Sequence, residues 1–337
     1  MREKERGRKG GGARAGEGGP GSVPTVEVSP PTARRPPRPA VALETDECVA
    51  TIEARPGEPS EHLFRTLLGA YLGGAHGFVV RGSPRLTPEA RDVVRTFCRR
   101  TRQPEILSDE PNVIRLSDVA SESSLPLPRS ILRMGRLVVE FHREAVASWN
   151  RLPLGGDGYW SRRDDEIDRE AWYIQRLAAV RLGRGGGGDA FLGPWTVARS
   201  LERIADHAVI LGEEGPRLAD LREGGDPLTS LRQFHRQAMT HLEGALKADI
   251  GPMANDVLDV GEALLSSGRA LSERLLPTVG GGSMPPATAA AVARVLESIG
   301  RTVAYAQDIA QVVLDRTLAS PERPVGEVRL PTPLVQA

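Results

Sequence analysis

The chain has few cysteines, few aromatic residues and no long apolar run. Its two cysteines, Cys48 and Cys98, lie in different segments with no CxxC spacing, which excludes a disulfide framework and a zinc knuckle. Nowhere do about 18 apolar residues follow one another, as a membrane-spanning helix requires. The N-terminal sequence MREKERGRKGGGARAGEGG has no apolar core of a signal peptide. We therefore expect a soluble cytoplasmic protein without membrane insertion.

Lysine and an excess of positive charge are also missing. Lysine occurs only at Lys4, Lys9 and Lys247 beside many arginines, a bias that we attribute to coding rather than to nucleic-acid recognition. Lys and Arg together number 44, as do Asp and Glu, so the formal net charge at pH 7 is zero. A dedicated duplex binder usually carries a basic excess that releases counterions from phosphate. The charge balance therefore argues against such a protein.

Composition predicts a tail, then a small α/β domain. Residues 1–45 are Gly, Pro, Arg and Glu with scarcely any apolar residues, which predicts a disordered Arg-rich tail. Residues 46–120 are expected to form the α/β domain. In it, VATIEA, HGFVVRG, EILSD and NVIRLSD predict strands, and SEHLFRTLLGAYLGG and LTPEARDVVRTFCRRT predict helices. Ser60 is the expected N-cap of the first helix, and Thr87, followed by Pro88, is that of the second.

Six long helical segments follow, separated by breaks such as LGRGGGG, REGGDP, DIGP and VGGGSMPP. Long helices joined by short loops pack antiparallel, so the segments predict helical bundles and a mainly α protein. LERIADHAVILGEE and LESIGRTVAYAQDI share the frame Leu-Glu-x-Ile, each in the third helix of a set of three, which indicates a duplicated three-helix unit. The bundles are expected at residues 125–225 and 226–320, with a C-terminal tail at 321–337.

Two pairs of acidic residues four positions apart are the candidate functional residues. They are Asp164 and Asp168 in RRDDEIDRE, and Glu202 and Asp206 in LERIADHA. Residues at this spacing share one face of a helix. Antiparallel packing of the second and third helices of a bundle would bring both pairs together as an oxygen-rich site for a hard or borderline cation. The same spacing is common on solvated helix faces, so by itself it leaves both interpretations open.

The apolar residues of the second acidic segment predict which side of its helix is buried. Ile204, Ala208 and Leu211 fall on roughly the opposite side from the acidic pair, which places that pair on the outer, wetter face. His207 is expected beside the acidic pair or in solvent. No Ser-His-Asp or Cys-His arrangement is recognisable, so no catalytic residue is predicted.

LERIADHAVILGE resembles the ERIGDHA motif of PhoU proteins, which are phosphate-signalling regulators built from two three-helix bundles. DDEIDREAWYIQR resembles the D-x-x-x-D segment of their preceding helix. A further block resembles the middle region of archaeal PhoU-domain proteins. Its segments occur in the same order: LLGAYLGGAHGFVVRG, LTPEARDVVR, EIL and IRLSDV, followed by LPRSILRMGRLVVEFHREAV. The resemblance covers Ile52 to Leu318. It implies two tandem three-helix bundles preceded by a small α/β domain.

In that family, carboxylates of E/D-x-x-x-D motifs bind metal ions, often as multinuclear iron or zinc clusters. The resemblance therefore implies iron or zinc at Asp164, Asp168, Glu202 and Asp206. The second repeat keeps Glu297, but Arg301 stands where the first has Asp206, and a guanidinium repels metal and would pair with Glu297. Asp256 and Asp259 on the preceding helix are three apart and do not restore the pattern, so we expect no second site.

The resemblance implies a non-enzymatic cytoplasmic regulator of phosphate uptake or phosphate signalling. Its expected partners are components of the phosphate ABC transporter or a regulatory protein, and we expect a homodimer. A metal-dependent all-α nucleotide pyrophosphohydrolase is the alternative, although such enzymes mostly use i,i+3 acidic spacing. A DNA-associated transcriptional regulator is the third hypothesis. The AbrB-like DNA-binding domain that commonly begins archaeal relatives has no counterpart in residues 1–45, so DNA binding is not carried over.

Overall fold

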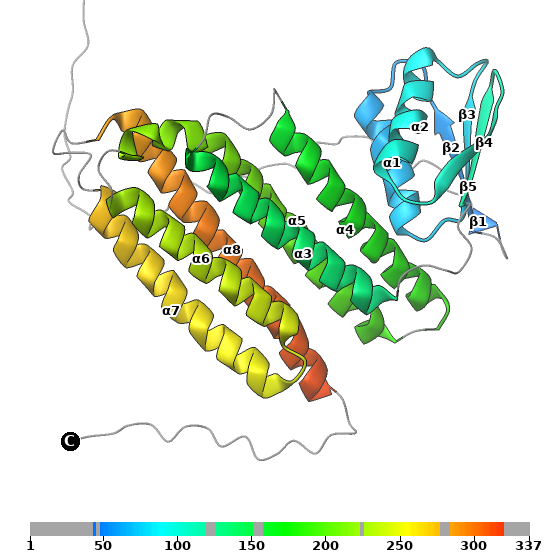
Figure 1. Ribbon diagram of the computed structural model, residues 1–337. Helices are drawn as coiled ribbons and strands as arrows, with labels where there is room; N and C mark the ends of the chain where they lie inside the picture. The colour runs from blue at the N-terminus through cyan, green and yellow to red at the C-terminus, as the bar shows by residue number, and fades with distance from the viewer. Residues whose placement is uncertain are drawn as a thin grey trace, which may run out of the picture. The chain divides into compact units, whose positions relative to one another are not determined.

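The computed structural model describes residues 43–44, 48–118, 126–150, 158–185, 187–222, 226–276 and 284–319. A small α/β unit precedes six long helices (Figure 1). The strands are β1 (Leu43–Glu44), β2 (Val49–Ala54), β3 (Gly77–Gly82), β4 (Pro104–Asp109) and β5 (Val113–Asp118). The helices are α1 (Ser60–Leu72), α2 (Pro88–Arg100), α3 (Leu127–Ala147), α4 (Tyr159–Gly183), α5 (Gly188–Glu214), α6 (Asp226–Lys247), α7 (Gly251–Leu275) and α8 (Pro286–Ala319), with 3-10 turns η1 (Ser148–Asn150) and η2 (Gly215–Arg222).

The α/β unit is a five-stranded sheet in the order β1-β2-β3-β5-β4. β2 and β3 pair in parallel, with α1 as the crossover between them, and the other pairs are antiparallel. α1 and α2 bury apolar residues one helical turn apart, which pack with the sheet in a core of their own. The four strands and two helices predicted for this domain are confirmed. Two residues of the segment predicted as a tail form β1, and the rest of both predicted tails lies outside the described residues.

Of the two N-cap residues predicted in the α/β unit, one is confirmed and one is wrong. Thr87 is the N-cap of α2, as predicted: its hydroxyl accepts a hydrogen bond from the amide of Ala90 at 3.2 Å, and Pro88 follows. The prediction for Ser60 is wrong. Pro59 has an extended backbone (φ −56°, ψ 135°) and occupies the cap position, so Ser60 is already the first helical residue and no side chain caps α1.

The six long helices form two successive sets of three, α3–α5 and α6–α8, and the mainly α fold predicted from sequence is confirmed. The most extensive contact between any two helices joins α5 to α8, the third helix of each set. Buried residues of both sets form one continuous hydrophobic core. Ile204, Ala208 and Leu211 lie in it with no exposed surface, as their spacing predicted. The exact domain limits given above remain predictions.

Gly212 of α5 lies against the side chain of Trp160 of α4. A Cβ atom at this position would lie against the indole ring of Trp160, closer than real Cβ contacts occur. Since neither the ring nor the helix backbone can yield easily, we expect Gly212→Ala to lower the free energy of unfolding by about 1–3 kcal/mol. Gly300→Ala in α8 is the matched control, because no atom lies within 4 Å of its Cβ position.

Chemical denaturation followed by circular dichroism checks this prediction. Ala at position 300 should raise the free energy of unfolding by about 0.5–1 kcal/mol, because alanine has the higher helix propensity. Two substitutions with the same sign and size would show that α4 and α5 do not approach closely at Gly212.

Candidate functional site

The two predicted acidic pairs lie on neighbouring helices that run antiparallel. Asp164 and Asp168 occupy the first half of α4, and Glu202 and Asp206 the second half of α5. Burial raises the pKa of Asp164 to about 7, and the charges of Asp168, Asp206 and Glu202 add to this effect in that order. Charge effects of Asp206 and Glu202 on Asp164 indicate that the carboxylates of α4 and α5 face each other. The predicted meeting of the two pairs is therefore found in the structure.

The cluster is less exposed than the sequence indicated. Side-chain exposure is 16% for both Asp168 and Glu202, and Oδ1 of Asp164 is buried without a hydrogen-bond partner. Glu202 and Asp206 are on the more exposed side of α5, opposite the fully buried Ile204, Ala208 and Leu211, but they are only partly exposed. The carboxylates are thus half-buried between two helices.

Burial and mutual repulsion disfavour ionisation of the whole cluster. Burial first, and then the charge of Glu202, raise the pKa of Asp168 to about 6 even though the Arg100 guanidinium opposes the shift. Burial also raises the pKa values of Glu202 and Asp206, against the lowering effect of Arg199 and Arg203. A group of acids with raised pKa values gains most from an added positive charge.

Arginine side chains balance part of this charge. Nη2 of Arg100, at the end of α2, pairs with Asp165 and lies 3.2 Å from Oδ2 of Asp168. Arg199 and Arg203 lie 3.3 and 3.8 Å from Glu202. Among the residues that the structure describes, no three of Asp, Glu, His and Cys stand in an arrangement that could hold a metal ion. The four carboxylates supply the type of oxygen ligand that hard cations prefer, but not that arrangement, and Oδ1 of Asp164 is buried without a hydrogen-bond partner.

Part of the chain is similar to a known protein family. Residues 131–214 match the family model described as the PhoU domain. This segment of the chain is similar to PhoU domains. The matched segment runs from α3 to the last residue of α5 and includes all four carboxylates. No curated protein sequence matches the chain.

The second helix set, α6–α8, does not repeat the site. Arg301 and Glu297 are exposed on α8 and pair at 3.9 Å, as the substitution at the Asp206-equivalent position predicted. Asp256 and Asp259 are exposed on α7. The carboxylate cluster therefore belongs to one of the two repeats.

His207 does not belong to the cluster either. Its ring stacks on Tyr305 of α8 with centroids 6.0 Å apart, and burial, followed by the charge of Arg301, lowers its pKa. The expectation that it lies beside the acidic pair or in solvent is wrong, because α8 covers this side of α5. Asp165 and Arg100 are the site residues that the sequence did not single out.

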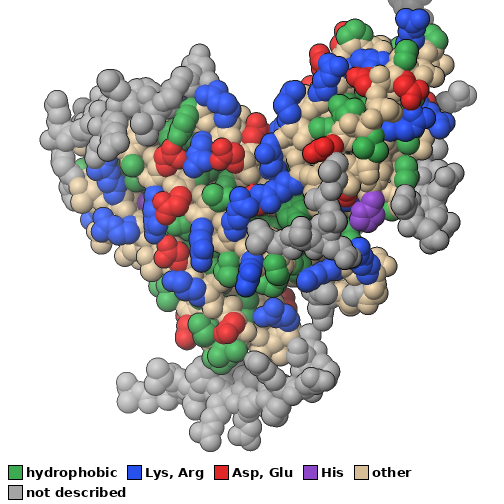
Figure 2. Space-filling model, turned by 45° about the vertical axis from the view of Figure 1, so that its right-hand side comes forward, with side chains coloured by type: hydrophobic (Ala, Val, Ile, Leu, Met, Phe, Trp, Pro, Cys, Tyr) green, Lys and Arg blue, Asp and Glu red, His purple; other side chains and the backbone are tan. Residues whose placement is uncertain are grey.

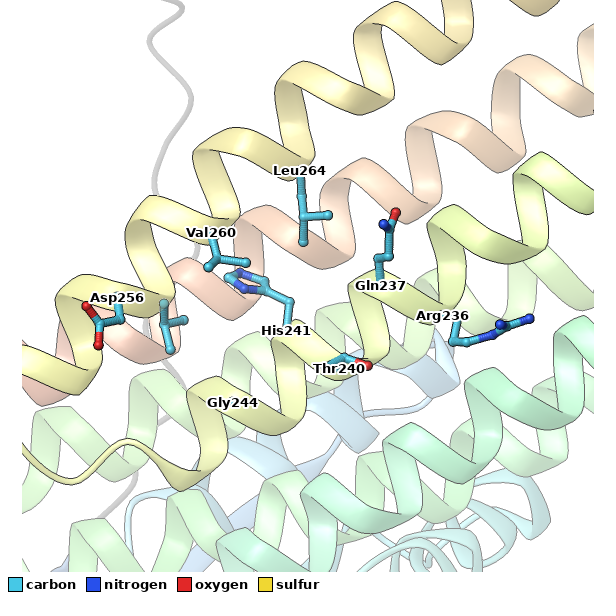
Figure 3. Close-up of a pocket in the computed structure, with 9 residues that line it drawn as sticks. Arg236, Gln237, Thr240, His241, Gly244, Asp256, Val260 and Leu264 are labelled. Atoms are coloured by element: carbon cyan, nitrogen blue, oxygen red, sulfur yellow. The ribbon is translucent and has the colours of Figure 1, made fainter.

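A groove of about 500 Å³ lies between α6 and α7. Figure 3 shows His241 of α6 pointing toward Val260 of α7 across it. His241 is only 4% exposed, its Nε2 has no hydrogen-bond partner, and burial lowers its pKa. The groove is lined mainly by apolar surface and is distinct from the carboxylate cluster.

None of the described helices combines the length and apolar character needed to span a membrane. On the face drawn in Figure 2, Lys and Arg side chains are interspersed with acidic and apolar ones. This agrees with the zero formal net charge of the chain.

Proposed function

We propose that this protein is a non-enzymatic regulator of phosphate uptake or phosphate signalling that acts through protein contacts. The PhoU-domain match carries the proposal, because it covers most of one three-helix set, from within α3 to the end of α5. Partners are components of a phosphate transporter or a regulatory protein, and the protein acts in the cytoplasm as a homodimer. Exposed apolar residues on α7, Met253 and Val260, support docking through helix surfaces.

The proposal includes one metal site. Asp164, Asp168, Glu202 and Asp206 would hold the ion, with iron or zinc as the metals implied by the family resemblance. When bound, the ion would supply the positive charge that four half-buried carboxylates lack. The protein's own residues would hold the carboxylates on two packed helices, so that metal occupancy would reinforce the contact between α4 and α5.

Metal content of the purified full chain tests the site. We expect stoichiometric metal in the wild type and loss of at least most of it in Glu202→Gln/Asp206→Asn, because half of the donor set becomes neutral amide. Glu297→Gln is the matched control, since it is the equivalent position of the second repeat and pairs only with Arg301 among the described residues. Elemental analysis measures all three proteins.

Folding of the double variant is checked in the same samples after chelation. Without metal, removing two repelling carboxylates should leave the free energy of unfolding equal to or higher than that of the wild type. Equal metal content in the wild type and the double variant, or no metal in either, would contradict the proposed site.

A further inference from the structure

We infer that the groove between α6 and α7 is the surface through which two copies of this chain pair about a two-fold axis. The inference rests on the homodimer of the proposed function and names the surface that forms it. Three features of the groove carry it: a partly uncovered apolar row on α7, a buried histidine nitrogen without a partner, and two exposed charges of opposite sign.

The apolar row lies along one face of α7. Its members are separated by four, three and four residues, the spacing with which apolar side chains pack against a second helix: Met253, Val257, Val260 and Leu264. Leu264 is 9% exposed, but Met253 and Val260 are 39% and 51% exposed. Within the described part of the chain, α6 therefore covers one side of the row and leaves the other side to water.

His241 of α6 points to an occupant that brings a hydrogen-bond donor. It is 4% exposed, and Figure 3 shows its ring turned toward Val260 across the groove. Burial lowers the pKa of His241, so the neutral ring donates to the backbone of Val303 through Nδ1 and keeps a lone pair on the unpartnered Nε2. A buried acceptor without a donor costs free energy. Gln237 and Thr240, which line the same groove, carry donors that a second copy would supply.

Two exposed charges lie at opposite ends of the groove. Asp256 of α7 is at the end marked by Gly244, since a Cβ atom on Gly244 would lie 3.8 Å from the neighbouring Val257. Arg236 precedes Gly244 by eight residues, which is about 12 Å along α6. Figure 3 shows Arg236 and Asp256 on either side of His241. The groove thus has a positive end and a negative end.

A surface with this charge pattern is complementary to itself. In a two-fold pair the same surface of both copies meets, so that residue i contacts residue j and j contacts i. A two-fold axis through the middle of the groove, perpendicular to the line from Arg236 to Asp256, would set each arginine opposite the partner's Asp256. Val260 would then lie near the axis and pack into the partner's groove. Such complementary charges fix the orientation of the second copy.

Sedimentation equilibrium of the full chain tests the surface by charge reversal. Arg236→Asp and Asp256→Arg, each alone, would set like charges opposite each other at both ends of the groove. Each should raise the dissociation constant of the dimer at least about tenfold. An equimolar mixture of the two variants forms opposite-charge pairs again and should restore the wild-type dissociation constant. Arg269→Asp is the matched control, because Arg269 is exposed on α7 but does not line the groove.

Val260→Asp tests the same surface without charge pairing. It should give a monomer with an unchanged circular dichroism spectrum, because the side chain is half exposed in the single chain. A dimer that survives Val260→Asp or both single charge reversals, or a mixture of the reversed variants that stays monomeric, would overturn this surface and leave the homodimer to form elsewhere. A wild-type chain that stays monomeric at every concentration would overturn the surface and the proposed homodimer together.

Discussion

Arg176→Met is expected to lower the free energy of unfolding by about 3–5 kcal/mol. Arg176 of α4 is 2% exposed, pairs with Asp118 at the end of β5 and donates to the carbonyl of Tyr71 at 2.8 Å. Its guanidinium carbon also lies 4.7 Å from the centroid of the Tyr71 ring. The substitution would leave Asp118 nearly buried, with the half-exposed ring of His76 3.4 Å away. An uncompensated buried carboxylate is the main cause of the loss.

Urea denaturation at pH 7 measures the effect, with Arg115→Met as the control. Arg115 also pairs closely, at 2.6 Å from Glu110, but both side chains are about half exposed, so its removal should cost less than about 1 kcal/mol. The double variant Arg176→Met/Asp118→Asn should recover part of the loss, because the unpaired charge is then absent. A loss no larger than that of Arg115→Met would show that Arg176 does not hold the α/β unit to α4.

The second large effect is a loss of stability in acid caused by two buried histidines. His142 of α3 and His235 of α6 stack with centroids 5.6 Å apart. Burial lowers the pKa of His142 to about 4 and that of His235 to about 3. Nε2 of His142 donates to the carbonyl of Ile204 at 2.7 Å, which leaves Nδ1 bare and without a partner. The neighbouring charges of His207 and Arg143 further oppose protonation.

The direction of the pH dependence follows from these lowered pKa values. In the unfolded chain both histidines protonate near pH 6.5, whereas the folded protein resists protonation down to about pH 4. Their contribution to stability is therefore complete above pH 6.5 and is lost as the pH falls toward 4. For His142 the loss at pH 4 is on the order of 3 kcal/mol.

Unfolding curves of the metal-free protein between pH 4 and 8 test this. His235→Gln cannot titrate, so its stability should fall less steeply than that of the wild type below about pH 6.5. The carboxylate cluster makes stability change with pH in the opposite direction, but it is present in both proteins. Subtracting one curve from the other therefore cancels its contribution. His62→Gln, an exposed position on α1, is the control and should follow the wild type. Parallel curves for His235→Gln and the wild type would contradict the assignment.

Local sequence signals predicted the helices and the presence of the site. Gly- and Pro-rich breaks separated six periodic segments, and all six are helices near the expected limits. The Thr87-Pro88 start was predictable because a cap depends on neighbours in the chain. The meeting of the acidic pairs followed from the antiparallel order of α4 and α5, which short connections impose.

The sequence could not show which residues from distant segments complete the site. Arg100 precedes Asp168 by 68 residues and comes from a different structural unit, so no spacing links them. The burial of Glu202 and the position of His207 depend on how closely α4 and α8 cover α5. That coverage depends on packing details such as Gly212 against Trp160, which a helical period does not contain.

The continuous core shared by the two helix sets has a consequence for how the protein folds. The sequence repeat divides the helices three and three, but α5 and α8 bury their apolar faces against each other. Separating the sets would expose that surface to water, so neither half is an independent folding unit. We therefore expect all six helices to unfold together rather than in two steps along the sequence repeat.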